Sequence, residues 1–584
     1  MSNPSCRAVR FDDFVLDVSA YELRRHGRSI RIERRPMELL ILLVNRRGEL
    51  VTRDQIVGHL WGPDVFIDID ASVNTVIRKV RRALRDSAEN SRFIQTIQGK
   101  GYRFIADIDP LHSSAVLAVL PFENLQSDAD QDYIADGLTE ETIAELGQID
   151  PEHLSVVGRT SSIAYARTAT KALTEIAGEL GADFLIEGSV RGAGGQLRIT
   201  VKLIRARDQL QVWTESYDRA SNNLLGLQAE LGRAIAQQIH LRLSAERSAT
   251  KARRQTQNPE AYNLYLRGRH YNNQMTPATL ARGLDCFRLA TSIDPTYALA
   301  WAGIADSYSS RLFSTDTRPS DVSDQARAAA EQALKYGAAN PDVCKSAALI
   351  QFLFDWDWPA AEKNLRRAIS LDPSFVHSYW LLGQVLTAQA KHDEALAEAQ
   401  HAREIDPLNP LIHSMSAHVA FCACEYEIAA RYAREALPAE PDYWIGYLQL
   451  GQALQPMGLT EQALEALAEA SRLSNQNSKP VALSAYILAL GGRIGEAREV
   501  LSTLEQLSRT RYVPPCAIAL VYSALNDDDT AFRWLDRARA ERDVHLIYLP
   551  FDSKWDHLKE DPRFLDFVHR CGFLTAHSAE RAAV

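Results

Sequence analysis

One short phrase recurs at a fixed spacing in the C-terminal half of the chain, and it limits the available folds more than any other feature. The phrase reads AISLDPSF, AREIDPLN and ALPAEPDY, with its acid–proline pairs at 372–373, 406–407 and 440–441. The steps are 34 residues, and ATSIDPTY at 290–297 is an earlier copy. Proline cannot continue a helix, so each copy predicts the end of one helix and the start of the next.

Small residues stand where the predicted helices would touch, for example Gly383, Ala388 and Gly451. Small side chains let paired helices pack closely. A helix-turn-helix period of 34 residues is typical of the tetratricopeptide (TPR) repeat. We therefore expect about eight units over residues 258–575, irregular between 310 and 345 and again after 475, stacked into an α-solenoid.

A solenoid of this kind presents a concave groove, and it exposes far more surface than a spacer needs. We therefore expect a protein or peptide partner in the groove. The alternative is a spacer in which the groove aromatics simply fill the core; these are Tyr379, Trp380, Tyr443, Trp444 and Tyr447.

The N-terminal segment differs from the rest in charge. Residues 1–108 carry 19 Lys and Arg against 14 Asp and Glu, although the 584-residue chain has a net charge of −10. A basic segment ahead of an acidic body suggests that only this segment meets a polyanion.

The order of patterns in residues 7–108 predicts a winged helix. FDDFVLD and YELRRHGRSIRI alternate like short antiparallel strands, RRPMELLILLVNRRGEL reads as a helix with Pro36 near its start and Gly48 at its stop, and TRDQIVGHLWG reads as a shorter helix capped by Thr52. A third helix follows in ASVNTVIRKVRRALRD, for which Asp70 or Ser72 could be the cap. RFIQTIQGKGYRFIAD predicts a β-hairpin that turns on glycines.

The third helix has two unlike faces. At 100° per residue, an apolar stripe should face the core; its members are Val73, Ile77, Val80 and Leu84. Polar and basic side chains project away from that stripe; they are Asn74, Thr75, Arg78, Lys79 and Arg82. A helix fits the major groove of B-DNA, where Arg and Lys read guanine and Asn reads adenine. The hairpin, with Lys100 at its tip, would lie against the adjacent backbone or minor groove.

The LWG, VNTVIRKVRRALRD and RFIQTIQGKGYRF motifs together resemble the DNA-binding domain of the OmpR/PhoB winged-helix family. The resemblance implies that the third helix enters the major groove and the wing touches the minor groove of double-stranded DNA. It places base contacts at Asn74, Thr75, Lys79 and Arg81, and phosphate or backbone contacts at Trp61, Ser72, Arg78, Thr96 and Tyr102. The helical wheel puts Arg81 near the edge of the exposed face. Gln98 stands where several relatives have an arginine.

The resemblance also bears on regulation. The chain starts almost directly with the winged helix, so we expect no phosphorylated receiver domain ahead of it. In this respect the chain resembles the one-component branch of the family, seen in ToxR and CadC, although no membrane helix follows. Relatives of this domain often bind tandem half-sites, so we expect a homodimer on DNA.

Residues 114–245 alternate strand and helix patterns, which predicts an α/β domain with a mixed sheet. The LAVLPF start and the ADFLIEGSVR…WTESYDR core resemble the TolB N-terminal-like domain. GAGG at 192–195 lies between two strands and is read as a hairpin turn, not a phosphate loop. The Asp128, Asp130 and Asp132 run lacks the Gly and Glu spacing of an EF-hand and is read as a solvated helix start.

No catalytic motif stands out, so we expect a protein that is not an enzyme, with no catalytic residues, no cofactor and no metal. The seven scattered cysteines fit a reducing compartment, and the CAC at 422–424 is read as core packing. No apolar run approaches the ~18–20 residues that cross a bilayer, so we expect a cytoplasmic chain without membrane contact.

The predicted fold class is therefore multidomain: an N-terminal winged helix-turn-helix, a central α/β mixed-sheet domain and a C-terminal all-α TPR solenoid. The predicted function is a cytosolic one-component transcriptional regulator that binds promoter DNA and recognises a partner or signal through the solenoid. The alternative is a TPR scaffold whose winged helix contacts proteins.

Overall fold

The chain divides into two compact units, Met1–Ala115 and Val116–Val584. The computed structural model describes residues 8–17, 22–25, 28–30, 32–60, 69–87, 91–106, 109–111, 115–125, 132–149, 154–163, 165, 171–193, 196–220, 227–238, 256–274, 276–438 and 440–573. The predicted central and C-terminal domains lie together in the second unit, so their boundary at 245–258 stays a prediction.

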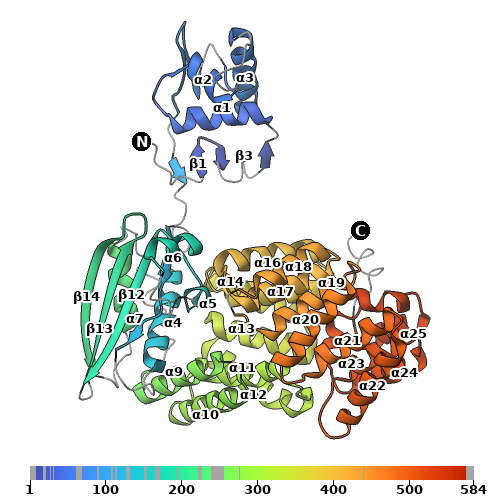
Figure 1. Cartoon of the computed structure of the whole chain (residues 1–584). Coiled ribbons are helices and arrows are strands. Elements are labelled where there is room, and N and C mark those ends of the chain that lie inside the picture. Colours follow the sequence, from blue (N-terminus) through green and yellow to red (C-terminus); the bar gives the residue numbers. More distant parts are fainter. Residues whose placement is uncertain are drawn as a thin grey trace. The chain divides into compact units, whose positions relative to one another are not determined.

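The first unit has helices α1–α3 between two small sheets (Figure 1). Its helices are α1 (Arg34–Asn45), α2 (Arg53–Leu60) and α3 (Ile69–Leu84). A five-stranded antiparallel sheet has the order β4-β3-β2-β1-β8, formed by β4 (Arg28–Ile30), β3 (Glu22–Arg25), β2 (Phe14–Asp17), β1 (Ala8–Phe11) and β8 (Asp109–Leu111). The wing is a three-stranded sheet of order β5-β7-β6, formed by β5 (Val51–Thr52), β7 (Gly101–Phe104) and β6 (Ile94–Ile97).

Apolar burial joins these elements into one core. Four aromatic rings from the first sheet and the wing meet edge-to-face or stacked, with centroids 5.1–5.7 Å apart; they are Phe11, Phe14, Phe93 and Phe104. Ring pairs of this geometry add about 0.5–1.5 kcal/mol beyond their area. The cluster fixes the wing to the strands that precede the helices.

Two cap predictions had opposite outcomes. Thr52 caps α2 as expected: its Oγ1 accepts from the Gln55 amide at 3.3 Å, and the Gln55 side chain accepts from the Thr52 amide at 3.0 Å. This reciprocal pair is a capping box. The cap prediction for α3 is wrong, because the helix begins at Ile69 and both Asp70 and Ser72 lie inside it.

The second unit begins with a six-stranded mixed sheet, as the alternating pattern predicted. Its main path is β11-β9-β12-β13-β14, formed by β11 (Leu154–Val156), β9 (Ala115–Val119), β12 (Phe184–Ala193), β13 (Gln196–Arg205) and β14 (Leu210–Ala220), and β10 (Glu123–Asn124) pairs with β12. The β9–β12 and β10–β12 pairs are parallel, and β12–β13–β14 are antiparallel. The accompanying helices are α4 (Asp132–Ile149), α5 (Arg159–Ile163), α6 (Leu173–Leu180) and α7 (Leu227–Gln238).

The pairing of Ala193 with Gln196 confirms that GAGG closes a hairpin, although the two turn residues 194 and 195 lie outside the described residues. Asp132 begins α4, as the solvated-helix-start interpretation requires. Asp128 and Asp130 lie outside the described residues. Within the described part of the chain, no group of three His, Cys, Asp or Glu side chains is placed to hold a metal ion.

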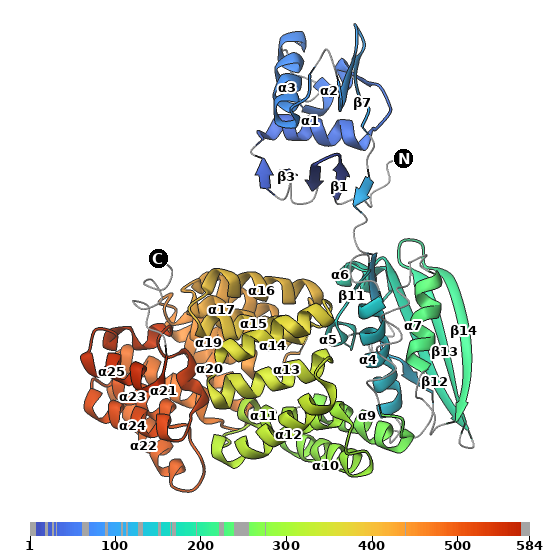
Figure 2. The same cartoon turned by 180° about the vertical axis from the view of Figure 1, so that it is seen from behind.

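Eight consecutive antiparallel helix pairs and a final helix complete the described part of the second unit (Figures 1 and 2). The pairs are α9 (Pro259–Asn273) with α10 (Pro277–Ile293), α11 (Ala298–Ser314) with α12 (Ser323–Gly337), α13 (Pro341–Ile350) with α14 (Trp358–Leu371), α15 (Val376–Ala388) with α16 (His392–Ile405), α17 (Pro410–Cys422) with α18 (Tyr426–Glu435), α19 (Trp444–Leu454) with α20 (Thr460–Leu473), α21 (Ser478–Leu490) with α22 (Ile494–Ser508), and α23 (Pro515–Ala524) with α24 (Asp528–Ala540). The last helix is α25 (Pro562–Cys571). The described helices thus match the predicted number of units.

Side-chain contacts explain the recurring phrase. Two of the repeated Asp residues follow the second helix of a pair and accept from an amide of the turn that they start: Asp294 binds the Thr296 amide at 2.9 Å, and Asp372 binds the Ser374 amide at 3.0 Å. The third, Asp406, accepts from the Ser161 amide of α5 and from the Asn409 side chain, both at 2.8 Å. Close helix contact explains the small residues. A Cβ on Gly451 would come within 2.6 Å of the Leu467 side chain, so only glycine fits between α19 and α20.

Polar side chains anchor the α/β part of the second unit to the first helix pairs. Arg269 of α9 forms an ion pair with Glu140 of α4, and His270 contacts Asp136 at 2.6 Å. The pKa of Glu140 is lowered: burial raises it, and the nearby Arg269 and Arg159 charges outweigh that effect. Helices α4 and α7 lie between the sheet and the solenoid in both views (Figures 1 and 2).

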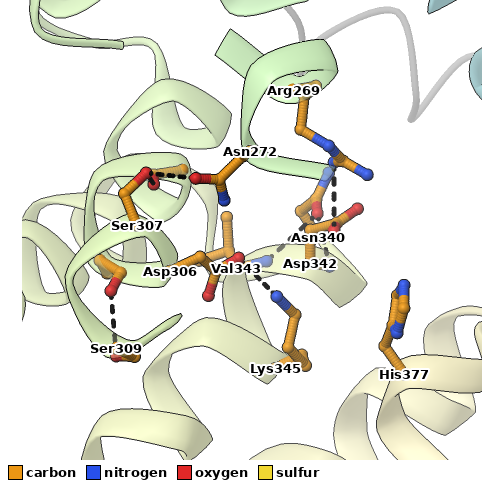
Figure 3. Close-up of polar contacts among 12 residues, drawn as sticks. Arg269, Asn272, Asp306, Ser307, Ser309, Asn340, Asp342, Val343, Lys345 and His377 are labelled. Atoms are coloured by element: carbon orange, nitrogen blue, oxygen red, sulfur yellow. Dashed lines mark hydrogen bonds and ion pairs between the residues drawn. The ribbon is translucent and has the colours of Figure 1, made fainter. Parts of the chain in front are cut away.

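The anchoring cluster continues inside the solenoid, where α9, α11, α13 and α15 converge (Figure 3). Lys345 donates to Asp306 at 2.5 Å, and Arg269 lies 3.6 Å from Asp342. Burial and the Lys345 and Arg269 charges lower the pKa of His377 to about 4, so this ring is neutral at pH 7. The charges in this cluster are paired with one another, which makes it a junction and not an open binding site.

The inner face of the solenoid, defined as the face built by the first helices of the pairs from α11 to α23, is partly filled by the chain itself. Two 3₁₀ helices, η4 (Val544–Tyr548) and η5 (Ser553–Leu558), return onto it. The Tyr548 hydroxyl donates to Gln384 at 2.6 Å, and Lys554 donates to Gln452 at 2.9 Å. The chain's own C-terminal segment therefore occupies part of the groove that the sequence predicted for a peptide partner.

The two ends of the inner face also meet. Asp316, just after α11, accepts from the amide and hydroxyl of Ser478 at the start of α21, at 3.1 and 2.8 Å. The Lys479 ammonium donates to the Leu312 carbonyl at 2.8 Å. Residues more than 160 positions apart thus close the solenoid on itself.

Among the described residues, no helix is both long and apolar enough to cross a bilayer.

Candidate nucleic-acid interface

Helix α3 presents the surface that the sequence predicted. Its apolar stripe is buried: Val73 and Val80 are fully enclosed, Ile77 and Leu84 are at most 3% exposed, and Val76, which the wheel analysis left out, also belongs to the core. On the opposite side, polar and basic side chains are exposed; they are Asn74, Thr75, Arg78, Lys79 and Arg82. Ser72 is half-buried one turn nearer the start of the helix.

A polar network holds Asn74 in place. The Tyr102 hydroxyl of the wing donates to the Asn74 Oδ1 at 2.9 Å, and Arg53 donates to the same oxygen at 3.2 Å. The Arg53 guanidinium also lies 5.6 Å from the centre of the Tyr102 ring. Because Arg53 and Tyr102 both donate to its Oδ1, the orientation of the Asn74 side chain is fixed. Its amide nitrogen is left to donate to another group.

Tyr102 itself is almost fully buried, at 3% exposure. Its predicted contact with the DNA backbone stays a prediction, and the observed role is to position Asn74. Arg53, at the first position of α2, was missed by the sequence analysis because its partners lie 21 and 49 residues away.

Lys79 forms an ion pair with an acidic residue at the start of α1. Its ammonium lies 2.6 Å from a carboxylate oxygen of Glu33, and the two side chains are 44% and 69% exposed. An ion pair this exposed is worth about 0–1 kcal/mol, so a phosphate could displace Glu33 at little cost.

Arg81 points at the wing. Its guanidinium donates to the Ile94 carbonyl at 2.8 Å and to the Thr96 hydroxyl at 2.9 Å, and its side chain is only 12% exposed. Base contact by Arg81 therefore stays a prediction that would require these two bonds to break. Thr96 is exposed, and in this structure its hydroxyl is engaged by Arg81.

Asp86, just beyond α3, organises the start of the wing. Its fully buried carboxylate accepts from the amides of Arg92 at 2.7 Å and Ile94 at 3.0 Å. It also lies 3.9 Å from Arg81. The carboxylate therefore ties the C-terminal end of α3 to the first strand of the hairpin.

The wing turn depends on two glycines, as predicted. Gly99 has a φ of +69°, a left-handed conformation that glycine adopts without a steric penalty. Gly101 has a φ of +156°, and a Cβ there would lie 2.1 Å from the Val51 carbonyl oxygen. Lys100 is exposed between them, so the turn presents a cation at its tip.

A shallow hollow lies between α3 and the wing. Its lining includes Arg78, Arg82 and Asn74 from α3, with Tyr102 from the wing. Among the described residues, Arg78, Arg82 and Lys100 form no ion pair. The surface therefore offers cations whose acceptors are not supplied by the described part of the protein. Trp61, a predicted backbone contact, lies outside the described residues.

Two family comparisons match the N-terminal part of the chain. Residues 27–104 match the family "Transcriptional regulatory protein, C terminal", and residues 113–234 match "HilA/YgeH-like transcriptional regulator, second domain". The second match covers the segment for which a TolB-like domain was expected, and the TolB resemblance stays a prediction.

Similar proteins fall into two groups. A protein named putative adenylate cyclase 3 from Rhizobium meliloti is 33% identical over 189 residues, and the match spans about a third of each chain (32% of both). The transcriptional regulator HilA of Salmonella typhimurium is 24% identical over 404 residues, which cover 68% of this chain and 70% of HilA.

Solved structures match single parts of the chain. The DNA-binding domain of Klebsiella pneumoniae RstA, solved with the RstA box, is 26% identical, with a TM-score of 0.16 over 17% of this chain and 97% of that one. A TPR protein of Thermus thermophilus is 21% identical, with a TM-score of 0.27 over 29% of this chain and 91% of that one. Residues 27–104 thus match an OmpR/PhoB-type DNA-binding domain and residues 113–234 a HilA-like second domain, both of the kind found in transcriptional regulators, and they precede a region of TPR-like helix pairs.

Proposed function

We propose that the exposed face of α3 enters the major groove of promoter DNA while the wing lies against the adjacent minor groove. The observation that carries this proposal is the pairing of a fully buried apolar stripe with an exposed basic stripe on one helix. Arg78, Lys79 and Arg82 supply the positive charge, and Asn74 supplies an oriented amide. Arg and Asn are the side chains that read guanine and adenine edges.

The residues divide by role within this proposal. Asn74, Thr75 and Lys79 contact bases, whereas Ser72, Arg78 and Arg82 contact phosphates, and Lys100 reaches the minor groove. Arg81, Thr96 and Tyr102 hold the helix and the wing together, because their polar groups are bonded inside the unit. This assignment moves Arg81 from reading bases to positioning the reader.

We further propose that the chain is a one-component regulator that acts without catalysis and works in the cytoplasm, where promoter DNA is found. It pairs on tandem half-sites, and the TPR-like region recognises a protein or a signal. The matched regulator families support this assignment. The match to putative adenylate cyclase 3 covers about a third of each chain, and that relative's name assigns no catalytic group to this chain.

DNA fragments that copurify with the full chain would supply the probes for the test. Arg78→Ala and Arg82→Ala should each weaken binding by about 1–3 kcal/mol, or roughly 5- to 150-fold, and each should lower the salt slope by about 1 if it removes a phosphate contact. Arg46→Ala is the matched control, since it removes one exposed arginine at the end of α1, away from the hollow.

Fluorescence anisotropy over a range of salt concentrations measures both quantities. Equal binding by all three variants and the unchanged chain would refute the DNA interface. Copurification of no enriched DNA sequence, together with capture of a protein by the first unit, would favour the scaffold alternative.

A further inference from the structure

A cavity of about 220 Å³ lies inside the closed solenoid. The first helices of successive pairs line it from α11 to α23, and the returning segment of η4 and η5 covers it. A water molecule needs roughly 10–15 Å³ of such space, so the cavity has room for a molecule of on the order of ten to fifteen non-hydrogen atoms. It is far larger than the packing defects found in ordinary protein cores.

The walls of the cavity are mainly apolar and aromatic. Trp380 and Trp444 contribute indole rings, Leu483 and Leu520 contribute aliphatic groups, and Tyr548 closes one side. Apolar walls with a few convergent polar groups are typical of small-molecule sites. The lining alone would suit any apolar compound of the right size.

One charged group makes the site more selective. Lys479 lines the cavity at the second position of α21, and its ammonium lies 5.9 Å from the Trp444 ring. Among the described residues, its hydrogen-bond acceptor is a single neutral group, the Leu312 carbonyl. Burial lowers the pKa of Lys479 and outweighs the opposing effect of the Asp316 and Asp543 charges.

The two carboxylates whose charges act on this ammonium already accept hydrogen bonds from other groups. Asp316 accepts from both donors of Ser478, and Asp543 accepts from the amides of Cys516 and His545 and contacts the His545 ring. The second lysine of the lining, Lys554, is paired with Asp552 at 2.7 Å and bonded to Gln452. Among the described residues, Lys479 is thus the cation of the cavity with the least compensation from the chain.

We infer that this cavity binds a small amphipathic carboxylate, with the carboxylate on Lys479 and the apolar body between Trp380, Trp444 and Leu483. A monoanion matches the single under-compensated cation, and a phosphate would bring a second charge into apolar walls. The site belongs to the solenoid alone and does not depend on DNA binding by the first unit.

Two matched pairs of compounds test the inference on the full chain. Decanoate and 4-phenylbutyrate are the carboxylates, and decanol and 4-phenylbutanol are their neutral counterparts. Calorimetry should give one site per chain for each carboxylate, with binding at least about tenfold tighter than the matching alcohol, because a charge-assisted hydrogen bond is added. Quenching of tryptophan fluorescence should follow the same titration, since the indoles of Trp380, Trp444 and Trp555 line the site.

Two variants locate the site. Lys479→Met should weaken carboxylate binding about tenfold or more and leave alcohol binding unchanged, whereas Lys363→Met, an exposed lysine on α14, should change neither. Ala517→Phe fills the cavity from α23 and should abolish binding of all four compounds. Circular dichroism melting checks that each variant is folded.

The preference for carboxylate over alcohol is measured on the unchanged chain, so it holds whether or not a variant folds. Absence of binding by both carboxylates would overturn the inference. Equal affinity for each carboxylate and its alcohol, or carboxylate binding unaffected in folded Lys479→Met, would also overturn it.

Discussion

The exposed face of α3 and the inner face of the solenoid both carry cations, but the cations differ in exposure and in ion pairing. Arg78 and Arg82 stand exposed on α3 without an ion-pair partner among the described residues. Lys345 and Lys554, inside the solenoid, are at most 9% exposed and form ion pairs with Asp306 and Asp552. An exposed unpaired cation costs little in water and can exchange its hydration for a phosphate, whereas a buried cation must be compensated by the fold or, as inferred for Lys479, by a bound anion.

The comparison also separates two ways of closing a structure. The wing of the first unit closes over a short stretch of chain, through the turn at Gly99 and Gly101. The solenoid closes over more than 160 residues, through Asp316 and the start of α21. If this distinction is correct, damage to each closure should be confined to its own unit.

The largest expected effect is in the wing. Gly101→Ala places a Cβ against the Val51 carbonyl oxygen, so it should destabilise the first unit by roughly 3–4 kcal/mol. Hydrogen exchange on the full chain should show lost protection in β6, β7 and α3, with unchanged protection in α15 and α17. Gly99→Ala is the matched control: its Cβ meets no atom within 4 Å, so only the positive φ is penalised, at about 1 kcal/mol. Equal effects of the two variants would show that the contact with Val51 does not matter.

The next effect concerns the closure of the solenoid. Asp316→Ala removes the acceptor for the Ser478 amide and hydroxyl, and Ser478 is fully buried, so its donors would be left unsatisfied. We expect a loss of roughly 2–4 kcal/mol in the second unit, with amide exchange accelerated first at the start of α21.

Asp321→Ala, an exposed acid only five residues further along, removes the same charge and should change stability by less than about 0.5 kcal/mol. If Asp316→Ala behaves like this control, the contact does not close the solenoid.

A smaller effect should appear on acidification of the second unit. Burial, with the Lys554 charge nearby, lowers the pKa of His418 from 6.5 to about 4, and its Nδ1 lies 3.1 Å from the Gln384 side-chain oxygen. Because the folded pKa is below the unfolded one, the unfolded chain binds this proton first. Titration of His418 therefore leaves the free energy of unfolding unchanged above about pH 6.5 and lowers it as the pH drops toward 4.

Between pH 7 and pH 5 the expected loss is on the order of 1–2 kcal/mol for this histidine. Urea unfolding at the two pH values measures it. His418→Gln should reduce the loss by that amount, whereas His569→Gln, at an exposed position of α25, should not. An unchanged pH dependence in His418→Gln would rule out this ring as a source of acid sensitivity.

These contacts also indicate what a sequence can predict. The stripe of Val73, Ile77, Val80 and Leu84 was predictable because a helical period is local information, and so was the Thr52 cap. The 34-residue phrase likewise predicted helix pairs, because Asp294 and Asp372 each bind the turn beside them.

Contacts between distant residues carried no such signal. A helical wheel gives the angle of Arg81 but not the presence of Ile94 and Thr96 beside it, so the base contact predicted for Arg81 competes with two bonds to the wing. The return of η4 and η5 onto the inner face, and the link from Asp316 to Ser478, join segments that share no pattern. The sequence predicted a concave groove, and for that reason it did not indicate that the chain itself covers part of it.

The smallest effect tests whether the cations of α3 are as available as the comparison requires. Glu33→Gln removes the acid beside Lys79 while both side chains stay at the surface, so stability should change by less than about 0.5 kcal/mol. Binding to a cognate DNA fragment should strengthen by about twofold to threefold at low salt, since Lys79 no longer has to leave a carboxylate, and the gain should fade as salt screens the pair.

Glu38→Gln is the control for the loss of one negative charge, because Glu38 pairs with Arg34 at 2.9 Å on α1 and not with α3. A gain in Glu33→Gln that exceeds the control would mean that Glu33 competes with DNA for Lys79. A gain equal in both variants would mean that only the net charge of the unit matters, and Lys79 would then lose its assignment as a specific contact.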